Sequence, residues 1–205
     1  MATRPTLPRP SVPRLWPGET VVCVGTGPSL TQADVDLCRG RTRVIAVNNA
    51  YQVAPWADVL YAADDKWWSW HKGAPTFAGL KYTIAPTRRA WPGLVVLRNT
   101  GQHGLERDPS GLRTGLNSGY QAIGLAVHLG ASRIVLLGYD MMGDHYFGSH
   151  PDKTRPPFAP CLKAFATLPG PLAEAGVEVV NATRRTALKT FPCVPIDTVL
   201  QAVAA

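Results

Sequence analysis

The sequence has no apolar run of the roughly 18 residues that a membrane-spanning helix needs. Its first 17 residues also lack the apolar segment of a secretory signal and hold three arginines and five prolines instead. We therefore predict an extended Arg/Pro-rich arm over residues 1–17, followed by a single domain over residues 18–205.

Cysteine and charge are both sparse. The four cysteines form no CxxC pair, so neither a disulfide framework nor a zinc site is expected, and we predict a reduced, cytoplasmic setting. Charged residues make up 17% of the chain, yet the net charge of +7 predicts an anionic partner. Nucleotides, nucleic acid and acidic glycans all fit, but the arginines form no stripe interleaved with aromatics, so nucleic-acid binding is not favoured.

Short runs rich in valine and isoleucine alternate with helical segments. The predicted strands cover residues 21–25, 43–48, 58–63, 94–98, 133–140 and 177–183. The predicted helices cover residues 118–131, 158–176 (interrupted by two prolines) and 195–205. This alternation predicts an α/β fold, Rossmann-like and doubly wound, with a mostly parallel sheet and ligands at the carboxyl ends of its strands. Residues 64–117 and 141–157 read as loop-rich and lid-like.

The first candidate binding stretch is the turn Gly25–Leu30, "GTGPSL". Glycines let backbone amides approach a phosphate, and Ser29 can cap the helix that follows. The stretch is neither a GxGxxG fingerprint nor a Walker loop, and a tight capped turn also explains it. We predict nucleotide contacts by Gly25, Thr26, Gly27 and Ser29.

Two further stretches place polar groups at strand and helix ends. Asn48 and Asn49 end a strand and can hydrogen-bond a ribose or a phosphate, although such a pair also suits a simple turn. Asn117, Ser118 and Gly119 begin the predicted helix 118–131, where they either cap it or receive a nucleotide.

The loop after residue 139 holds most of the groups that can move protons or bind phosphate. Asp140 ends a strand, and His145, Tyr146 and His150 follow. An imidazole can take a proton from an acceptor hydroxyl, and a tyrosine can stabilise a leaving phosphate. Lys153 and Arg155 are predicted phosphate or acceptor contacts on the same loop. The histidine spacing fits no standard metal site, so no metal is assigned.

An acidic and aromatic stretch, "AADDKWW", follows another predicted strand. Asp64 is a candidate for holding Mg²⁺ or for orienting a substrate hydroxyl. The tryptophans Trp67, Trp68 and Trp70 can stack on a base or sugar, or can pack in the core or lid.

In combination, "VGTGPSL", "VNN", "TGLNSGYQAIGLAVHLGASRIVLLGYD" and "HYFGSH" resemble a known group. They look like the bacterial sialyltransferases that use CMP-sialic acid (glycosyltransferase family 42) and the related superfamily of 6-hydroxymethylpterin pyrophosphokinases. Small bacteriophage proteins are the most similar, sharing the "GYDM" loop and the tail "VNAT". A phage origin would place the protein in the cytoplasm of a bacterial host.

The resemblance implies that the turn at Gly25, an asparagine at position 48 or 49 and the helix start at Ser118 surround a nucleotide. It implies His150 as general base and Tyr146 as partner of the leaving phosphate. One extra residue, in "GSH", leaves His145 as a second candidate base.

The preferred hypothesis is a nucleotide-dependent transferase, sialyltransferase-like, that moves a sugar from an activated donor to a hydroxyl acceptor without a metal. The co-substrate is a nucleotide-sugar, with CMP as one candidate nucleotide. One alternative is a Mg²⁺- and ATP-dependent pyrophosphokinase, in which an aspartate holds the metal. Another is a phage protein that only binds a nucleotide. The acceptor and the oligomeric state stay open.

Overall fold

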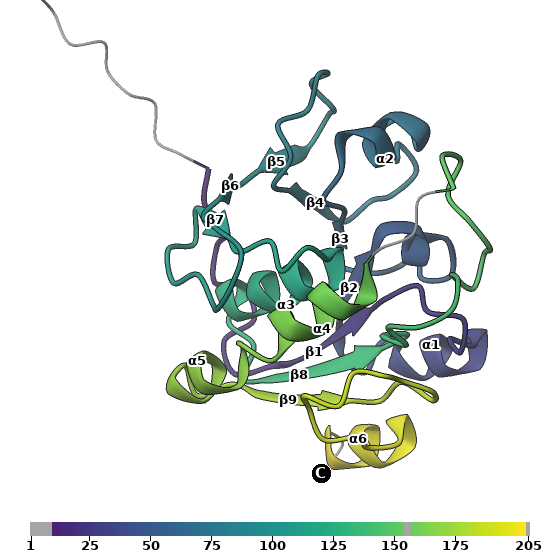
Figure 1. Cartoon of the computed structure of the whole chain (residues 1–205), viewed down its shortest axis with the longest axis vertical. Coiled ribbons are helices and arrows are strands. Elements are labelled where there is room, and N and C mark those ends of the chain that lie inside the picture. Colours follow the sequence, from purple (N-terminus) through teal and green to yellow (C-terminus); the bar gives the residue numbers. More distant parts are fainter. Residues whose placement is uncertain (1–9, 154–156, 204–205) are drawn as a thin grey trace, which may run out of the picture.

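The structure is a computed structural model that describes residues 10–153 and 157–203 (Figure 1). Its main sheet contains the strands β1 (Thr20–Val24), β2 (Arg43–Val47), β3 (Val59–Tyr61), β4 (Leu80–Thr83), β5 (Leu94–Val96), β8 (Arg133–Leu137) and β9 (Glu178–Asn181). Two short strands, β6 (Arg98–Asn99) and β7 (Gly111–Leu112), form a separate ribbon. The helices are α1 (Gln32–Cys38), η1 (Asn48–Gln52), α2 (Asp65–Trp70), α3 (Ser118–Leu129), α4 (Phe158–Phe165), α5 (Pro169–Glu174) and α6 (Ile196–Val203).

All neighbouring strands of the main sheet are parallel, in the order β5-β4-β3-β2-β1-β8-β9. Helices cover both faces, as Figure 1 shows for α3 and α4 on one side and α1 and α6 on the other. The Rossmann-like α/β prediction is therefore confirmed.

The central strands β1, β2 and β8 are apolar at every position after the first because the sheet is buried on both faces. In β1, Val21 and Cys23 face the core that α3 and α4 cover, whereas Val22 and Val24 face the core that α1 and α6 cover. Successive side chains of a strand point to opposite faces, so one continuous apolar run supplies both cores.

The order of the strands reverses beside β1. The chain runs outward from β1 to β5 on one side and then returns to place β8 on the other side. The connection after β1 leads to α1 on one face of the sheet, whereas the connection after β8 leads to α4 on the other face. In open α/β sheets, ligands bind in the crevice at such a point.

Residues 64–117 contain more regular structure than predicted. They include helix α2 and the strands β4 to β7. Strand β4 was missed because its sequence, "LKYT", carries a lysine. Lys81 is nevertheless 8% exposed, and its Nζ donates to the carbonyl of Gly73 at 3.0 Å.

Two predicted helix signals differ in detail. Helix α1 is capped by Thr31, whose hydroxyl accepts from the Asp34 amide, and not by Ser29. The predicted helix 158–176 is divided into α4 and α5, and Pro169 begins α5. Proline suits the first turn of a helix because the amide it lacks has no partner there.

The predicted arm does not end as an independent segment at residue 17. Residues 1–9 lie outside the described part of the chain, but Val12 and Trp16 are buried in the core beside α3. The Val12 amide donates to the Pro109 carbonyl at 2.9 Å, and the Trp16 amide donates to the Leu129 carbonyl at 2.7 Å. The folded domain therefore includes part of the predicted arm.

Candidate active site

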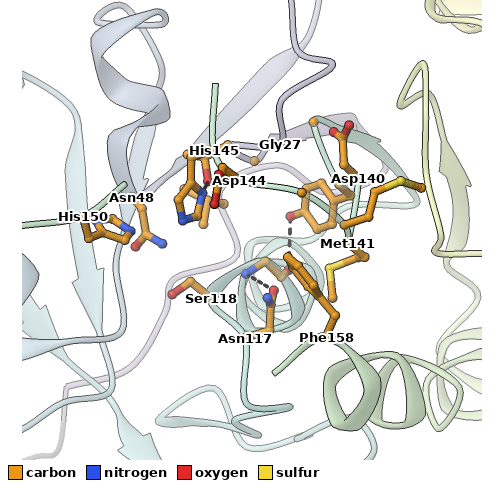
Figure 2. Close-up of a pocket in the computed structure, with 18 of the residues that line it drawn as sticks. Gly27, Asn48, Asn117, Ser118, Asp140, Met141, Asp144, His145, His150 and Phe158 are labelled. Atoms are coloured by element: carbon orange, nitrogen blue, oxygen red, sulfur yellow. Dashed lines mark hydrogen bonds between the residues drawn. The ribbon is translucent and has the colours of Figure 1, made fainter. Parts of the chain in front are cut away.

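A pocket of about 290 Å³ opens at the reversal point, between the loops that follow β1 and β8 (Figure 2). Eleven of the predicted site residues line it: Gly25, Thr26, Gly27, Asn48, Asp64, Asn117, Ser118, Gly119, Asp140, His145 and His150. These residues come from five separate stretches of the sequence. The sheet edge and the start of α3 bring them together.

The glycine-rich turn serves mainly to let two loops approach each other. A side chain at Gly25 would place its Cβ 2.6 Å from the Gly138 carbonyl oxygen, and one at Gly27 would overlap the Asp140 carboxylate. Most of the turn's amides are also engaged, because those of Gly25, Gly27 and Ser29 donate to groups at residues 137–140. The turn forms a wall of the pocket, and these three amides do not point at a ligand.

Two buried oxygen atoms of the pocket have no partner among the described residues. One is Oδ1 of Asp140, whose Oδ2 accepts from the Ser29 amide at 3.0 Å. The other is Oδ1 of Asn48, a residue with the positive φ of 51° that asparagine tolerates. Both are acceptors, so a ligand that supplies hydrogen-bond donors would satisfy them.

The Asp140 side chain is only 2% exposed. Burial raises the pKa of its carboxyl, and the hydrogen bonds from Ser29 oppose that rise. Leaving a buried acceptor unpaired costs about 1–3 kcal/mol, so this group favours a bound hydroxyl or amino group.

Two histidines of the 141–153 loop line the pocket. Nδ1 of His145 lies 2.8 Å from the Thr26 hydroxyl, and its ring stacks on Phe147. The His150 ring stacks on Trp70 with centroids 5.8 Å apart. Burial lowers the pKa of both imidazoles, so both favour the neutral form that can accept a proton.

The start of α3 contributes a capped helix end. Oδ1 of Asn117 accepts from the amides of Gly119 at 2.8 Å and Tyr120 at 3.2 Å. Asn117 is therefore the N-cap, while its side-chain NH₂ group and the Ser118 hydroxyl have no hydrogen-bond partner among the described residues and can donate at the pocket wall.

An apolar wall was not predicted from the sequence. Met141 and Met142 follow β8, and Phe158 begins α4. Figure 2 draws Asp140, Met141 and Phe158 on one side of the view and Asn48 and His150 on the other. Isolated methionines and phenylalanines carry no sequence signal that separates a pocket wall from a core.

Several predicted contacts lie elsewhere. Oδ1 of Asn49 accepts from the Trp67 indole at 2.7 Å, and the Tyr146 hydroxyl donates to the Asn49 carbonyl at 2.7 Å. Ser29 and Lys153 do not line the pocket in the described part of the chain, and Arg155 lies outside it.

The tryptophan cluster is mostly structural. Trp67 and Trp68 are buried in the core on the α1 and α6 side of the sheet. Trp70 reaches the site, by stacking on His150.

Within residues 10–153 and 157–203, no group of three His, Cys, Asp or Glu side chains is arranged to hold a metal ion. In the same ranges no helix has the length and apolarity to cross a bilayer. The cysteines are unpaired; three are buried and Cys193 is exposed.

No protein-family model matches the sequence, and neither does any curated protein. Two solved structures are similar in fold. The MAF glycosyltransferase from Magnetospirillum magneticum AMB-1 aligns with a TM-score of 0.65 at 12% identity, over 95% of this chain and 38% of its own. The sialyltransferase CstII from Campylobacter jejuni, solved with the substrate analogue cytidine-5'-monophosphate, aligns with a TM-score of 0.56 at 12% identity.

The CstII alignment covers 87% of this chain and 86% of that one, whereas this chain spans little more than a third of the MAF protein. At such identity the likeness establishes the fold. The shared fold agrees with the resemblance to sialyltransferases that the sequence motifs predicted.

Proposed function

We propose that the protein is a nucleotide-dependent glycosyltransferase, sialyltransferase-like in fold, that uses a histidine of the 141–153 loop as its base. The observation that carries this proposal is the pocket at the strand reversal, which is lined by two histidines, an apolar wall and two residues, Asp140 and Asn48, that each have a buried oxygen without a partner among the described residues. Two fold neighbours act on glycosyl donors according to their names, which supports the same class of reaction.

The nucleoside occupies the end of the pocket formed by Asp140, Met141 and Phe158. Flat bases pack well on aromatic and thioether groups. The free oxygen of Asp140 accepts from a ribose hydroxyl or a base amino group there.

The phosphate lies between the two histidines and the start of α3. Ser118 and Ser149 supply hydroxyls, and Asn117 supplies its side-chain amide. No lysine or arginine occurs among the described lining residues, so neutral donors carry much of the phosphate contact.

His150 is the preferred base and His145 the second candidate. The base takes the proton of an acceptor hydroxyl, the acceptor oxygen bonds to the anomeric carbon, and the bond from that carbon to the phosphate oxygen breaks. The leaving nucleotide keeps the electron pair. His150 suits the role because, among the described residues, its ring is seen only in ring contacts such as the stacking on Trp70, whereas Nδ1 of His145 is engaged with the Thr26 hydroxyl.

Thermal stabilisation tests the nucleotide site directly. CMP, UDP, GDP, ADP and ATP are each added with Mg²⁺ and with EDTA. A ligand at 100 times its Kd stabilises by about 2.7 kcal/mol, which raises the Tm by several degrees at this size. We expect stabilisation by a nucleoside mono- or diphosphate in EDTA.

The matched variant is Asp140→Asn, which turns part of an acceptor into a donor. We expect it to weaken the shift, whereas Asp36→Asn on the exposed side of α1 leaves the shift unchanged. No stabilisation by any nucleotide would refute the proposal.

The pyrophosphokinase is the second candidate, and one observation favours it. The pocket wall carries three aspartates, Asp64, Asp140 and Asp144, as would suit a Mg²⁺-bound triphosphate. Stabilisation by ATP with Mg²⁺ alone, lost in EDTA, would select this candidate over glycosyl transfer.

A further inference from the structure

A second cavity, of about 360 Å³, adjoins the pocket at its Asp64 side. The two share the wall residues Asp64, Leu116, Asn117 and Ser118. A ligand in the pocket can therefore extend past the start of α3 into this cavity.

The cavity is lined by neutral polar groups and small apolar surfaces. Gln121 is 4% exposed and is held in place, because its Oε1 accepts from the Tyr61 hydroxyl and its NH₂ donates to the Thr114 carbonyl, both at 2.6 Å. The second hydrogen of that NH₂ group has no partner in the described part of the chain and can bond to a ligand.

Asn99 and Thr114 add further capacity. Oδ1 of Asn99 accepts from the Gly101 amide at 3.1 Å, and its NH₂ group, which bonds to none of the residues that the structure describes, can donate to a ligand. Ile84 and Pro86 present apolar surface on the same wall. A pyranose has this combination of hydroxyls at its edge and C–H groups on its faces.

The charge of the wall is negative. Asp64 is its one charged residue, and no lysine or arginine lines it among the described residues. Two nearby cations pair with carboxylates outside this wall: Lys66 with Asp152 at 3.7 Å, and Arg88, 94% exposed, with Asp65 at 3.9 Å. A carboxylate on the ligand would meet Asp64 without a counter-charge on the wall.

We propose that the second cavity binds a neutral, polyhydroxylated sugar and disfavours a sugar that carries a carboxylate. The inference rests on the proposed function and names its sugar class. The sugar is either the transferred unit of the donor or the acceptor itself, since both present the same chemistry to this wall.

The test uses pairs of nucleotide-sugars that differ in a single carboxylate. They are UDP-glucose with UDP-glucuronate, GDP-mannose with GDP-mannuronate, and the methyl ester of CMP-N-acetylneuraminate with its free acid. The pair is chosen to match the nucleotide that stabilises the protein. Both nucleotide-sugars and the bare nucleotide are then titrated into the protein by calorimetry. We expect the neutral member to bind about tenfold more tightly, because like charges in a partly enclosed site repel by more than 1 kcal/mol.

Charge variants link the preference to this wall. Asp64→Asn should bring the ratio of the two affinities close to one. Asp65→Asn is the control, since it removes the neighbouring charge of a residue that does not line the cavity. Glucose and glucuronate, titrated with the bare nucleotide present, separate an acceptor site from a donor-sugar site.

The outcomes separate the two proposals. Tight nucleotide binding with equal or stronger affinity for the anionic sugar overturns this inference and leaves the nucleotide site standing. A preference that persists in Asp64→Asn overturns it as well. Failure of every nucleotide to bind overturns the proposed function, and this inference with it.

Discussion

Two neighbouring imidazoles show how position decides what a residue can do. His145 and His150 have ring centroids 4.8 Å apart. Burial lowers the pKa of each below the ordinary value of 6.5, and the nearby His150 charge lowers that of His145 further. Asp152 and Asp64 partly oppose the change at His150.

These pKa shifts predict the pH dependence of turnover. Because a general base must be neutral, activity should rise with pH and level off with a midpoint below 6.5. At lower pH the imidazole is protonated and cannot act as a base, so kcat/KM should fall as the pH falls. The measurement is kcat/KM from pH 5 to 8 with the donor that the binding experiments identify.

Variants decide between the two histidines. We expect His150→Gln to lower kcat by about 10²- to 10⁴-fold. The fall of kcat/KM at low pH, the acidic limb of the pH profile, should then disappear. His145→Gln should keep the limb, because an amide can still hydrogen-bond the Thr26 hydroxyl. If the limb vanishes in His145→Gln and survives in His150→Gln, His145 is the base.

Among the elements, the turn after β1 differs most from its expected role. The sequence "GTGPSL" suggested amides aimed at phosphate, but the amides of Gly25, Gly27 and Ser29 bond to the loop after β8. The glycines are needed because the two loops pass within van der Waals contact. The turn shapes the pocket because its glycines have no side chains, which allows the two loops to lie in contact.

Gly27→Ala tests this role of the turn. The new Cβ would overlap the Asp140 carboxylate, which is buried and tied to the Ser29 amide. We expect a loss of about 1–3 kcal/mol of unfolding free energy, typical of overpacking, together with weaker nucleotide binding. Chemical denaturation and nucleotide titration measure the two effects.

The matched control is Gly170→Ala in α5. Nothing lies within 4 Å of its ideal Cβ, and alanine is the better helix former. Stability should stay the same or rise slightly. Equal losses in the two variants would contradict the close-contact explanation for Gly27.

At the scale of the whole molecule, the domain begins earlier than its regular structure. Val12 and Trp16 pack beside α3; the Val12 amide donates to the Pro109 carbonyl, and the Trp16 amide donates to the carbonyl of Leu129 at the end of α3. Prolines and arginines dominate residues 1–17, so composition alone favoured an independent arm. The two buried apolar side chains outweigh that composition.

Truncation of Trp16 should therefore destabilise the whole fold. Its side chain is 4% exposed, and Trp→Ala in a core costs about 3–5 kcal/mol. For a domain of this size that lowers the Tm by roughly 10 °C. Leu15→Ala is the control, because Leu15 is 47% exposed and its loss should change stability by less than about 0.5 kcal/mol. Similar Tm values for the two variants would place residues 10–17 outside the cooperative unit.

The sequence alone determined the parallel sheet, its main strands and the ends of α3. Asn117 and Gly130 cap that helix as local chemistry requires, and a strand buried on both faces, such as β2, is apolar at every position after its first. The local sequence pattern was enough to predict these strands and helix ends, because helix capping and the two-residue period of a strand involve only a few neighbouring residues.

Only the tertiary structure decided which polar residues share a pocket. Asn48 and Asn49 are adjacent residues of the same type, so the sequence does not distinguish them. Oδ1 of Asn48 lies at the pocket without a partner among the described residues, whereas Oδ1 of Asn49 accepts from the Trp67 indole. Phe158 and Gly27 line the same pocket, although they lie 131 positions apart along the chain (158 − 27). Such contacts depend on the order in which strands pair, which arises from the packing of the whole sheet and not from any one segment.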